Sequence, residues 1–208
     1  MILYGYWRST ASWRVRIALN LKGVTVDHRA VNLVAGEQRL HDYLAHNPQG
    51  LIPALELDDG QVVTQSLAII DYLEETHPQP PLLPKDPFER AKARSLALLI
   101  ACDVHPLQNL SVIRHVAEIA GEGADKAWAA RVIGRGLDAF EARIADEPGP
   151  YCLGTQVTLA DVLLVPQLHN ARRFGLDVDW PRIAAVERAC LELDAFQNAL
   201  PDRQADAV

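Results

Sequence analysis

Hydroxyl side chains cluster at the predicted junction between the first strand and the first helix of the chain. The strand is expected over residues 2–6 (ILYGY) and the helix over residues 12–22, which ends at Gly23. The hydroxyls at this junction belong to Ser9, Thr10 and Ser12. A hydroxyl at a helix start can donate a hydrogen bond to an anion, which the helix dipole also stabilises. The alternative is that these hydroxyls only cap the helix.

A second candidate anion site lies where a helix begins after a predicted hairpin. Residues 54–57 and 62–64 flank an Asp-Gly pair, which favours a tight antiparallel turn. Gln65 and Ser66 then precede a helix that is expected to run to about Thr76. The free N–H groups and the dipole of this helix start favour a carboxylate, and Ser66 can cap the helix at the same time.

Two arginines are candidates for binding an acidic small molecule. A guanidinium offers paired planar donors that match a carboxylate, and Arg8 stands directly before the hydroxyl-rich turn. Arg173 is the second candidate, and for either residue the alternative is a solvated charge without a ligand. The formal net charge of −7 argues against a nucleic-acid partner, because nucleic-acid binders carry a basic surface. A local basic site and a small anionic substrate are therefore predicted.

The chain is expected to divide at a proline-rich segment. The elements before it follow the order βαβ and then ββα, with the second strand over residues 26–33. The stretch 77–87 (HPQPPLLPKDP) cannot continue a helix, and everything after it shows helical periodicity. We therefore predict an α/β domain over residues 1–78, a linker over 79–87 and an all-α domain over 88–208.

The helical half carries further features that bear on the site. A long helix is expected to be kinked at Pro106. His105 and Asn109 lie one helical turn apart and are expected to face one cleft, although a histidine packed beside the kink is the alternative. Asp161, in the sequence TLAD, is predicted to complete a capping box rather than to act as a catalyst. Residues 201–208 (PDRQADAV) are expected to form a loose tail.

The composition predicts a soluble cytoplasmic protein without a metal site. Cys102, Cys152 and Cys190 are far apart and form no Cys-x-x-Cys pair, so neither a disulfide framework nor a zinc site is expected. The first residues lack the pattern of a secretion signal, and no segment approaches the roughly 20 uninterrupted apolar residues of a membrane span. A hydrophobic fraction of 49% with 23% charged residues is typical of globular domains.

The sequence resembles the zeta class of the cytosolic glutathione transferases. Residues 6–19 (YWRSTASWRVRIAL) are similar to the class signature, in which a serine-rich turn precedes a tryptophan or histidine and then RVRIAL. Residues 47–55, 65–70, 105–112 and 165–174 contain further similar segments, so the resemblance spans both halves. It implies a thioredoxin-like N-terminal domain, a helical C-terminal domain and a homodimer.

The resemblance also implies that glutathione is the cofactor. A free thiol has a pKa of about 8.5, so only a small fraction is thiolate at neutral pH. Ser9 is then the main donor to the sulfur, assisted by Thr10 and Ser12, and Ile52-Pro53 is a cis-proline turn whose backbone pairs with glutathione. The implied glutathione-binding residues are Ser9, Ile52, Gln65, Ser66, His105 and Asn109. The implied substrate-binding residues are Arg8 and Arg173.

The implied activity is the isomerisation of maleylacetoacetate to fumarylacetoacetate in aromatic amino acid catabolism, in which a thiolate adds to a cis double bond and leaves after rotation. The usual Ser-Ser-Cys of the class reads Ser9-Thr10-Ala11 here. Maleylpyruvate isomerases also lack that cysteine, and their activity stays open. Further alternatives are a transferase or dehalogenase that acts on small α-halo acids, and a non-catalytic binding member. A thiol–disulfide oxidoreductase is disfavoured because residues 9–12 contain no cysteine.

Overall fold

The chain folds into two compact units. The computed structural model describes all of residues 1–208. The first unit combines Met1–Pro81 with Leu193–Val208, and the second is Leu82–Glu192. The predicted classes, α/β followed by all-α, are confirmed. The units differ from the expected boundaries in two respects: the predicted linker is divided between them after Pro81, and Leu193–Val208 packs with the first unit instead of with the helical one.

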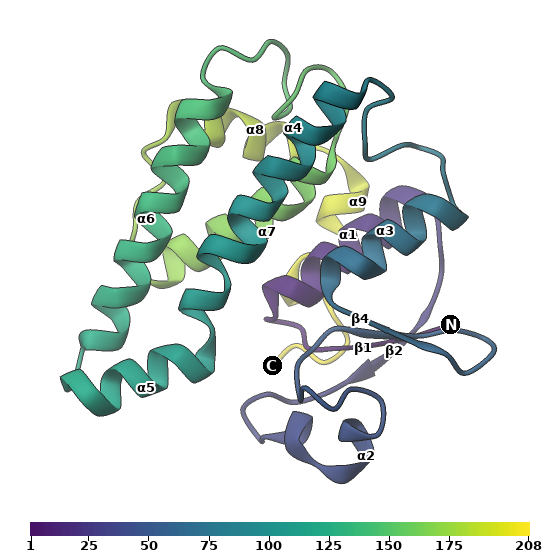
Figure 1. Ribbon diagram of the computed structural model, residues 1–208, viewed down its shortest axis with the longest axis vertical. Helices are drawn as coiled ribbons and strands as arrows, with labels where there is room; N and C mark the ends of the chain where they lie inside the picture. The colour runs from purple at the N-terminus through teal and green to yellow at the C-terminus, as the bar shows by residue number, and fades with distance from the viewer. The chain divides into compact units, whose positions relative to one another are not determined.

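The first unit is built on a four-stranded mixed sheet with the order β2-β1-β3-β4 (Figure 1). The strands are β1 (Ile2–Gly5), β2 (Asp27–Ala30), β3 (Ala54–Glu56) and β4 (Val62–Thr64). β1 runs parallel to β2 and antiparallel to β3, and β3 and β4 form the predicted hairpin. One register row joins Tyr4 to Ala54 and Ala54 to Thr64. The end of β1, the start of β3 and the end of β4 therefore lie at the same end of the sheet.

Helices cover both faces of this sheet. Helices α1 (Thr10–Lys22) and α3 (Ser66–Thr76) lie on one face, and the short α2 (His41–Leu44), after the 3-10 turn η1 (Glu37–Arg39), lies on the other (Figure 1). Tyr4 and Ala54 pack with Tyr43 of α2. Because side chains alternate along a strand, Leu3 and Leu55 point to the opposite face, where α1 and α3 lie. Both leucines are buried, so the sheet has an apolar core on each side.

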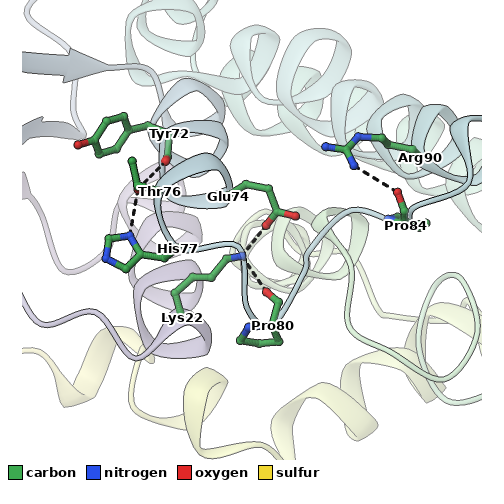
Figure 2. Close-up of polar contacts among 8 residues, drawn as sticks. All are labelled: Lys22, Tyr72, Glu74, Thr76, His77, Pro80, Pro84 and Arg90. Carbon is green, nitrogen blue, oxygen red and sulfur yellow. Dashed lines mark hydrogen bonds and ion pairs between the residues drawn. The ribbon is translucent and has the colours of Figure 1, made fainter.

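A buried lysine holds the chain where it leaves the first unit. The side chain of Lys22 is 0% exposed, and its Nζ donates to Glu74 Oε2 at 2.5 Å and to the carbonyl of Pro80 at 2.7 Å (Figure 2). At the end of α3, Thr76 Oγ1 donates to the carbonyl of Tyr72 at 2.7 Å (Figure 2). The two bonds of Lys22 fix Pro80 of the predicted linker to the ends of α1 and α3.

The second unit is a set of helices in which α7 contacts several of the others. Its α-helices are α4 (Pro87–Leu98), α5 (Leu110–Ala120), α6 (Ala124–Ile144), α7 (Leu159–Arg173) and α8 (Pro181–Leu191). Helix α7 contacts α4, α6 and α8, and nearly all of its residues are buried. Before α4, the chain is held by a hydrogen bond of 3.4 Å from Arg90 Nη1 to the carbonyl of Pro84 (Figure 2).

The expected long helix is broken at Pro106 more thoroughly than a kink requires. Helix α4 continues into a π-helical turn, η2 (Leu99–Val104), and a 3-10 turn, η3 (Pro106–Gln108), before α5 begins. The N–H of His105 donates to the carbonyl of Ile100 at 2.8 Å, which is the π-helical spacing. Proline lacks the N–H that an α-helix needs and clashes with the preceding turn. His105 and Asn109 therefore do not lie on one continuous α-helix, which corrects the basis of that expectation, and their facing one cleft stays a prediction.

No single helix is long and apolar enough to cross a bilayer, and only Pro87–Gln108 together with Leu110–Ala120, bent by 43°, meets the length and composition limits.

Asp161 forms the predicted capping box at the start of α7. Its carboxylate is 0% exposed and accepts hydrogen bonds from Thr158 N at 2.7 Å, Thr158 Oγ1 at 2.9 Å and Cys152 N at 2.8 Å. Burial raises the pKa of Asp161, and the bonds from Cys152 and Thr158 oppose that rise. The carboxylate joins the loop that contains Cys152 to the first turn of the central helix.

We expect Asp161→Ala to lower the free energy of unfolding by about 2–4 kcal/mol, because three buried donors lose their acceptor. Urea denaturation at neutral pH measures this change. The matched control is Asp146→Ala at an exposed position, which is expected to change stability by less than about 0.5 kcal/mol. Equal losses in the two variants would contradict the capping role.

Candidate functional site

Three connections converge at one end of the sheet in the first unit. β1 leads into the turn formed by residues 6–9, β3 is entered through Ile52-Pro53, and β4 leads into Gln65. Because β1, β3 and β4 are paired in register at that end, their connections are neighbours. The predicted site residues brought together in this way are Arg8, Ser9, Thr10, Ile52, Gln65 and Ser66.

Ser9 caps α1 and keeps a hydrogen to donate. Its Oγ accepts from the N–H of Ser12 at 3.2 Å, and its own N–H donates to the carbonyl of Tyr6 at 2.9 Å. A hydroxyl has one donor and two acceptor lone pairs, so the cap uses one lone pair and leaves the O–H for an anion. The dipole of α1 adds positive potential at the same place. Capping and anion binding are therefore compatible at Ser9.

The two hydroxyls expected to assist Ser9 are buried. Thr10 is the first residue of α1, and Ser12 is 0% exposed. A Cβ atom added to Gly5 would lie 3.2 Å from both Cβ and Oγ of Ser12, so Ser12 packs directly against β1. Ser12 therefore seats α1 on the strand that precedes the turn. An assisting role of Thr10 and Ser12 at a bound sulfur stays a prediction.

The loop before β3 presents the backbone of Ile52. The Ile52-Pro53 peptide is cis, as predicted, and Ile52 precedes the paired residues of β3. The adjacent carbonyl of Leu51 accepts from Tyr43 Oη and from Asn47 Nδ2, each at 2.6 Å. Asn47 is 2% exposed, and its Oδ1 also accepts from the N–H of Gln49 at 3.1 Å. Burial raises the pKa of Tyr43 to about 12, so its phenol stays a donor.

Gln65 has a strained backbone at the start of α3. Its φ of 71° and ψ of 122° make it the one non-glycine residue with positive φ, a conformation that costs about 1–3 kcal/mol and is found mainly at functional sites. Its Nε2 donates to Gln49 Oε1 at 3.0 Å. Ser66 is buried, and its Oγ accepts a long hydrogen bond of 3.5 Å from Arg14 Nη1. The strained backbone of Gln65 thus sets the direction in which the N-terminus of α3 points.

Arg8 is an exposed cation supported by two aromatic rings. Its guanidinium carbon lies 5.1 Å from the centroid of the Trp7 ring and 5.9 Å from that of Tyr6. Cation–π contact orients the side chain without using its N–H donors. Arg8 can therefore bind a carboxylate next to the hydroxyl of Ser9.

The second unit contains the other three predicted residues. His105 follows the π-helical turn, and Asn109 occupies the N-cap position of α5 without a capping hydrogen bond from its side chain. Arg173 ends α7 and is exposed, with its guanidinium carbon 5.4 Å from the Phe174 ring centroid. Its neighbour Arg172 instead binds Glu187 through two hydrogen bonds of 2.6 and 2.5 Å.

All three cysteines lie in the second unit. Cys102 is exposed, whereas Cys152 and Cys190 are buried. Burial raises the pKa of both buried thiols, and the nearby Asp161 carboxylate adds to the effect. No group of three or more His, Cys, Asp or Glu side chains is arranged to hold a metal ion. The site in the first unit therefore offers hydroxyl donors and backbone groups, and any thiol chemistry there needs a bound thiol.

The first unit has a thioredoxin-like fold, with a cis-proline at the start of β3 and a hydroxyl-capped helix after β1. The profile for the N-terminal domain of glutathione S-transferase matches residues 3–81, and that for the C-terminal domain matches residues 111–189. The chain belongs to the glutathione S-transferase family.

Individual relatives agree with the zeta-class resemblance. The maleylacetoacetate isomerase of Rhizobium meliloti (strain 1021) is 48% identical over 97% of this chain and 96% of its own. A maleylpyruvate isomerase structure described as a zeta-class glutathione S-transferase is 46% identical, covers both chains fully and has a TM-score of 0.96. A maleylacetoacetate isomerase structure from Methylobacterium extorquens AM1 with bound malonate and glutathione is 42% identical, with full coverage and a TM-score of 0.95.

Several residues that shape the site were not identified from the sequence. Gln49 pairs with Gln65, Asn47 and Tyr43 hold the loop before Ile52, and Arg14 reaches Ser66. The sequence contains only a weak signal for one of these residues, Arg14. An arginine within the apolar part of a predicted helix is unusual, because charged side chains are rarely buried without a partner.

We expect Gln65→Gly to raise the free energy of unfolding by about 0.5–1 kcal/mol, because glycine adopts positive φ without a steric penalty, and to weaken glutathione binding. The matched variant Gln65→Ala keeps the Cβ and loses the rest of the side chain, including the carboxamide, so it is expected to bind weakly without a gain in stability. Denaturant titration and calorimetry measure the two quantities. A glycine variant less stable than the alanine variant would show that the backbone is not strained.

Proposed function

We propose that the protein is a glutathione-dependent cis–trans isomerase that converts maleylacetoacetate to fumarylacetoacetate. The observation that carries the proposal is the pair Arg8 and Ser9 at the N-terminus of α1. A donor for a thiolate and a donor for a substrate carboxylate occupy consecutive residues. The identity of 48% to a maleylacetoacetate isomerase supports the same reaction, and the bound malonate and glutathione of another relative support an acidic substrate.

The residues at the end of the sheet fit a bound glutathione. Ile52 offers backbone N–H and C=O groups outside the paired residues of β3, which suit the peptide part of the ligand. Ser66 stands at the start of α3, where free N–H groups favour the γ-glutamyl carboxylate. When bound, glutathione would supply a thiolate whose reversible addition to the double bond permits rotation and then elimination, so that the cofactor is regenerated.

The chain contributes positioning and electrostatic stabilisation to this reaction. The hydroxyl of Ser9 donates to the sulfur and the dipole of α1 adds positive potential, and both lower the thiol pKa from about 8.5. Arg8 binds a substrate carboxylate and offsets the negative charge that develops as the double bond is attacked. Roles for His105, Asn109 and Arg173 in binding stay predictions.

The same residues support maleylpyruvate isomerisation as a second candidate. Ala11 stands where the zeta class usually has cysteine, and a maleylpyruvate isomerase structure matches this chain with a TM-score of 0.96. Maleylpyruvate is a shorter acid that needs the same thiolate and the same carboxylate donors. Transfer of glutathione to small α-halo acids is the remaining alternative and would leave a glutathionyl product.

The proposal also includes the setting in which the enzyme works. Its place is the cytoplasm, in the breakdown of aromatic amino acids, and its active form is a homodimer, as the family resemblance implies. Analytical ultracentrifugation across a range of concentrations measures the oligomeric state directly, and a monomer at all concentrations with full activity would contradict the dimer.

We expect Ser9→Ala to raise the pKa of the bound glutathione thiol by at least about one unit and to lower kcat/KM by about 100-fold, because the sulfur loses its hydroxyl donor. Ultraviolet absorbance of the thiolate against pH measures the pKa. Ser9→Thr keeps the hydroxyl and is expected to retain most of the activity. Ser9→Asp caps the helix but repels a thiolate, so activity in this variant would show that only the cap matters.

The substrate is decided by comparing kcat/KM for maleylacetone and maleylpyruvate with glutathione present. We expect maleylacetone, an analogue of maleylacetoacetate, to be the better substrate by about tenfold or more. The opposite order would make the protein a maleylpyruvate isomerase. Turnover of neither acid, with a glutathionyl product from α-halo acids, would replace isomerisation by transfer.

A further inference from the structure

The final segment of the chain is an ordered part of the first unit. The sequence predicts a loose tail over residues 201–208, but Leu193–Val208 belongs to the unit that contains the sheet. It forms α9 (Asp194–Gln197) and the 3-10 turn η4 (Pro201–Arg203). Phe196 and Ala199 are fully buried, and α9 contacts α1. The prediction of a loose tail was wrong because apolar residues upstream of it anchor the segment.

One buried guanidinium connects this segment to the turn before Ser9. Arg16 is 5% exposed, and its Nε and Nη2 donate to the carbonyl of Ala199 at 3.2 and 3.1 Å. Nη2 also donates to the carbonyl of Trp7 at 3.0 Å, and Nη1 makes a long hydrogen bond of 3.5 Å to the carbonyl of Tyr6. Burial lowers the pKa of Arg16 to about 10, so the side chain is charged at neutral pH.

A carboxylate of the same segment holds the other side of the turn. Asp206 Oδ2 accepts from the N–H of Trp7 at 3.0 Å. Both backbone groups of Trp7 are thus bonded, its C=O to Arg16 and its N–H to Asp206. The turn also contains the hydrogen bond of 2.9 Å from the N–H of Ser9 to the carbonyl of Tyr6. These contacts fix the peptide planes that set the directions of the next two residues in the chain.

We propose that Arg16 and Asp206 are positioning residues for the thiolate site. They touch neither the sulfur nor the substrate, but they hold the turn that carries Arg8 and Ser9. The kinetic consequence rests on the proposed function, whereas the effect on the turn does not. The final segment therefore supports the geometry of the site in addition to the stability of the unit.

When the carboxylate of Asp206 is removed, electrostatics and positioning predict opposite changes in the pKa of the bound thiol. Removing its negative charge would by itself favour a nearby thiolate and lower the thiol pKa. Losing the hydrogen bond to Trp7 would free the turn and raise the thiol pKa, because Ser9 would no longer be held in place. The variants Asp206→Asn and Asp206→Ala separate these effects, since asparagine keeps an acceptor oxygen and alanine does not.

The experiment measures the thiol pKa of bound glutathione, kcat, the KM for glutathione and the amide exchange of Trp7 and Ser9 in the full chain. For Asp206→Ala we expect a pKa about one unit higher, a kcat about tenfold lower at neutral pH, and a KM changed by less than about threefold. The deficit in kcat should shrink as the pH rises above the thiol pKa. Exchange of the two amides should be at least about tenfold faster.

Two control variants make the result specific. Asp206→Asn is expected to keep the wild-type thiol pKa or to lower it, with slow amide exchange. Asp202→Ala removes an exposed carboxylate from the same segment and is expected to match the wild type in all four measurements. If Asp206→Ala does not fold, Arg16→Lys tests the same point, because a single ammonium cannot replace the guanidinium fork and the thiol pKa should rise.

Several outcomes would overturn the proposal. Wild-type pKa and exchange in Asp206→Ala, or in Arg16→Lys where that variant is needed, would show that the turn does not depend on these residues. A loss of thermal stability with an unchanged thiol pKa would reduce their role to folding. A wild-type protein that does not ionise bound glutathione would instead contradict the proposed function, and the amide exchange data would still decide whether the final segment holds the turn.

Discussion

The in-register pairing of β1, β3 and β4 is the constraint on which the site depends. It places the turn before α1, the Ile52-Pro53 peptide and the start of α3 at one end of the sheet. A slip of one residue would turn Tyr4 and Ala54, which pack with α2, toward α1 and α3. The two apolar faces therefore specify the register, and the register brings together segments that are far apart in the sequence.

At this end of the sheet, the hydroxyl of Ser9 contributes both to the fold and to the proposed chemistry. Ser9 accepts the capping hydrogen bond of α1 and can donate its own hydrogen to an anion. The surrounding arginines differ in their surroundings, because Arg8 is exposed whereas Arg14 and Arg16 are buried and bond to other parts of the unit. A protein with a net charge of −7 thus concentrates cationic groups around a single turn.

Local signals in the sequence predicted the elements well. Gly23 ends α1 in the left-handed conformation, the Asp-Gly pair forms the hairpin, and Asp161 closes the capping box. The cis peptide at Pro53 followed from family resemblance. Contacts between distant residues were not predictable: polar composition made residues 201–208 look unattached, although Asp206 bonds to the first turn. The π-helical turn before Pro106 also depends on packing that periodicity does not reveal.

The first unit is discontinuous in sequence, since it needs Leu193–Val208 as well as Met1–Pro81. Chains emerge from the ribosome with the N-terminus first, so the nascent sheet and α1 are made long before the carbonyl of Ala199 can accept from Arg16. Throughout translation of the helical unit, that guanidinium must remain hydrated or find another acceptor. The thioredoxin-like unit is consequently begun before the helical unit and completed after it.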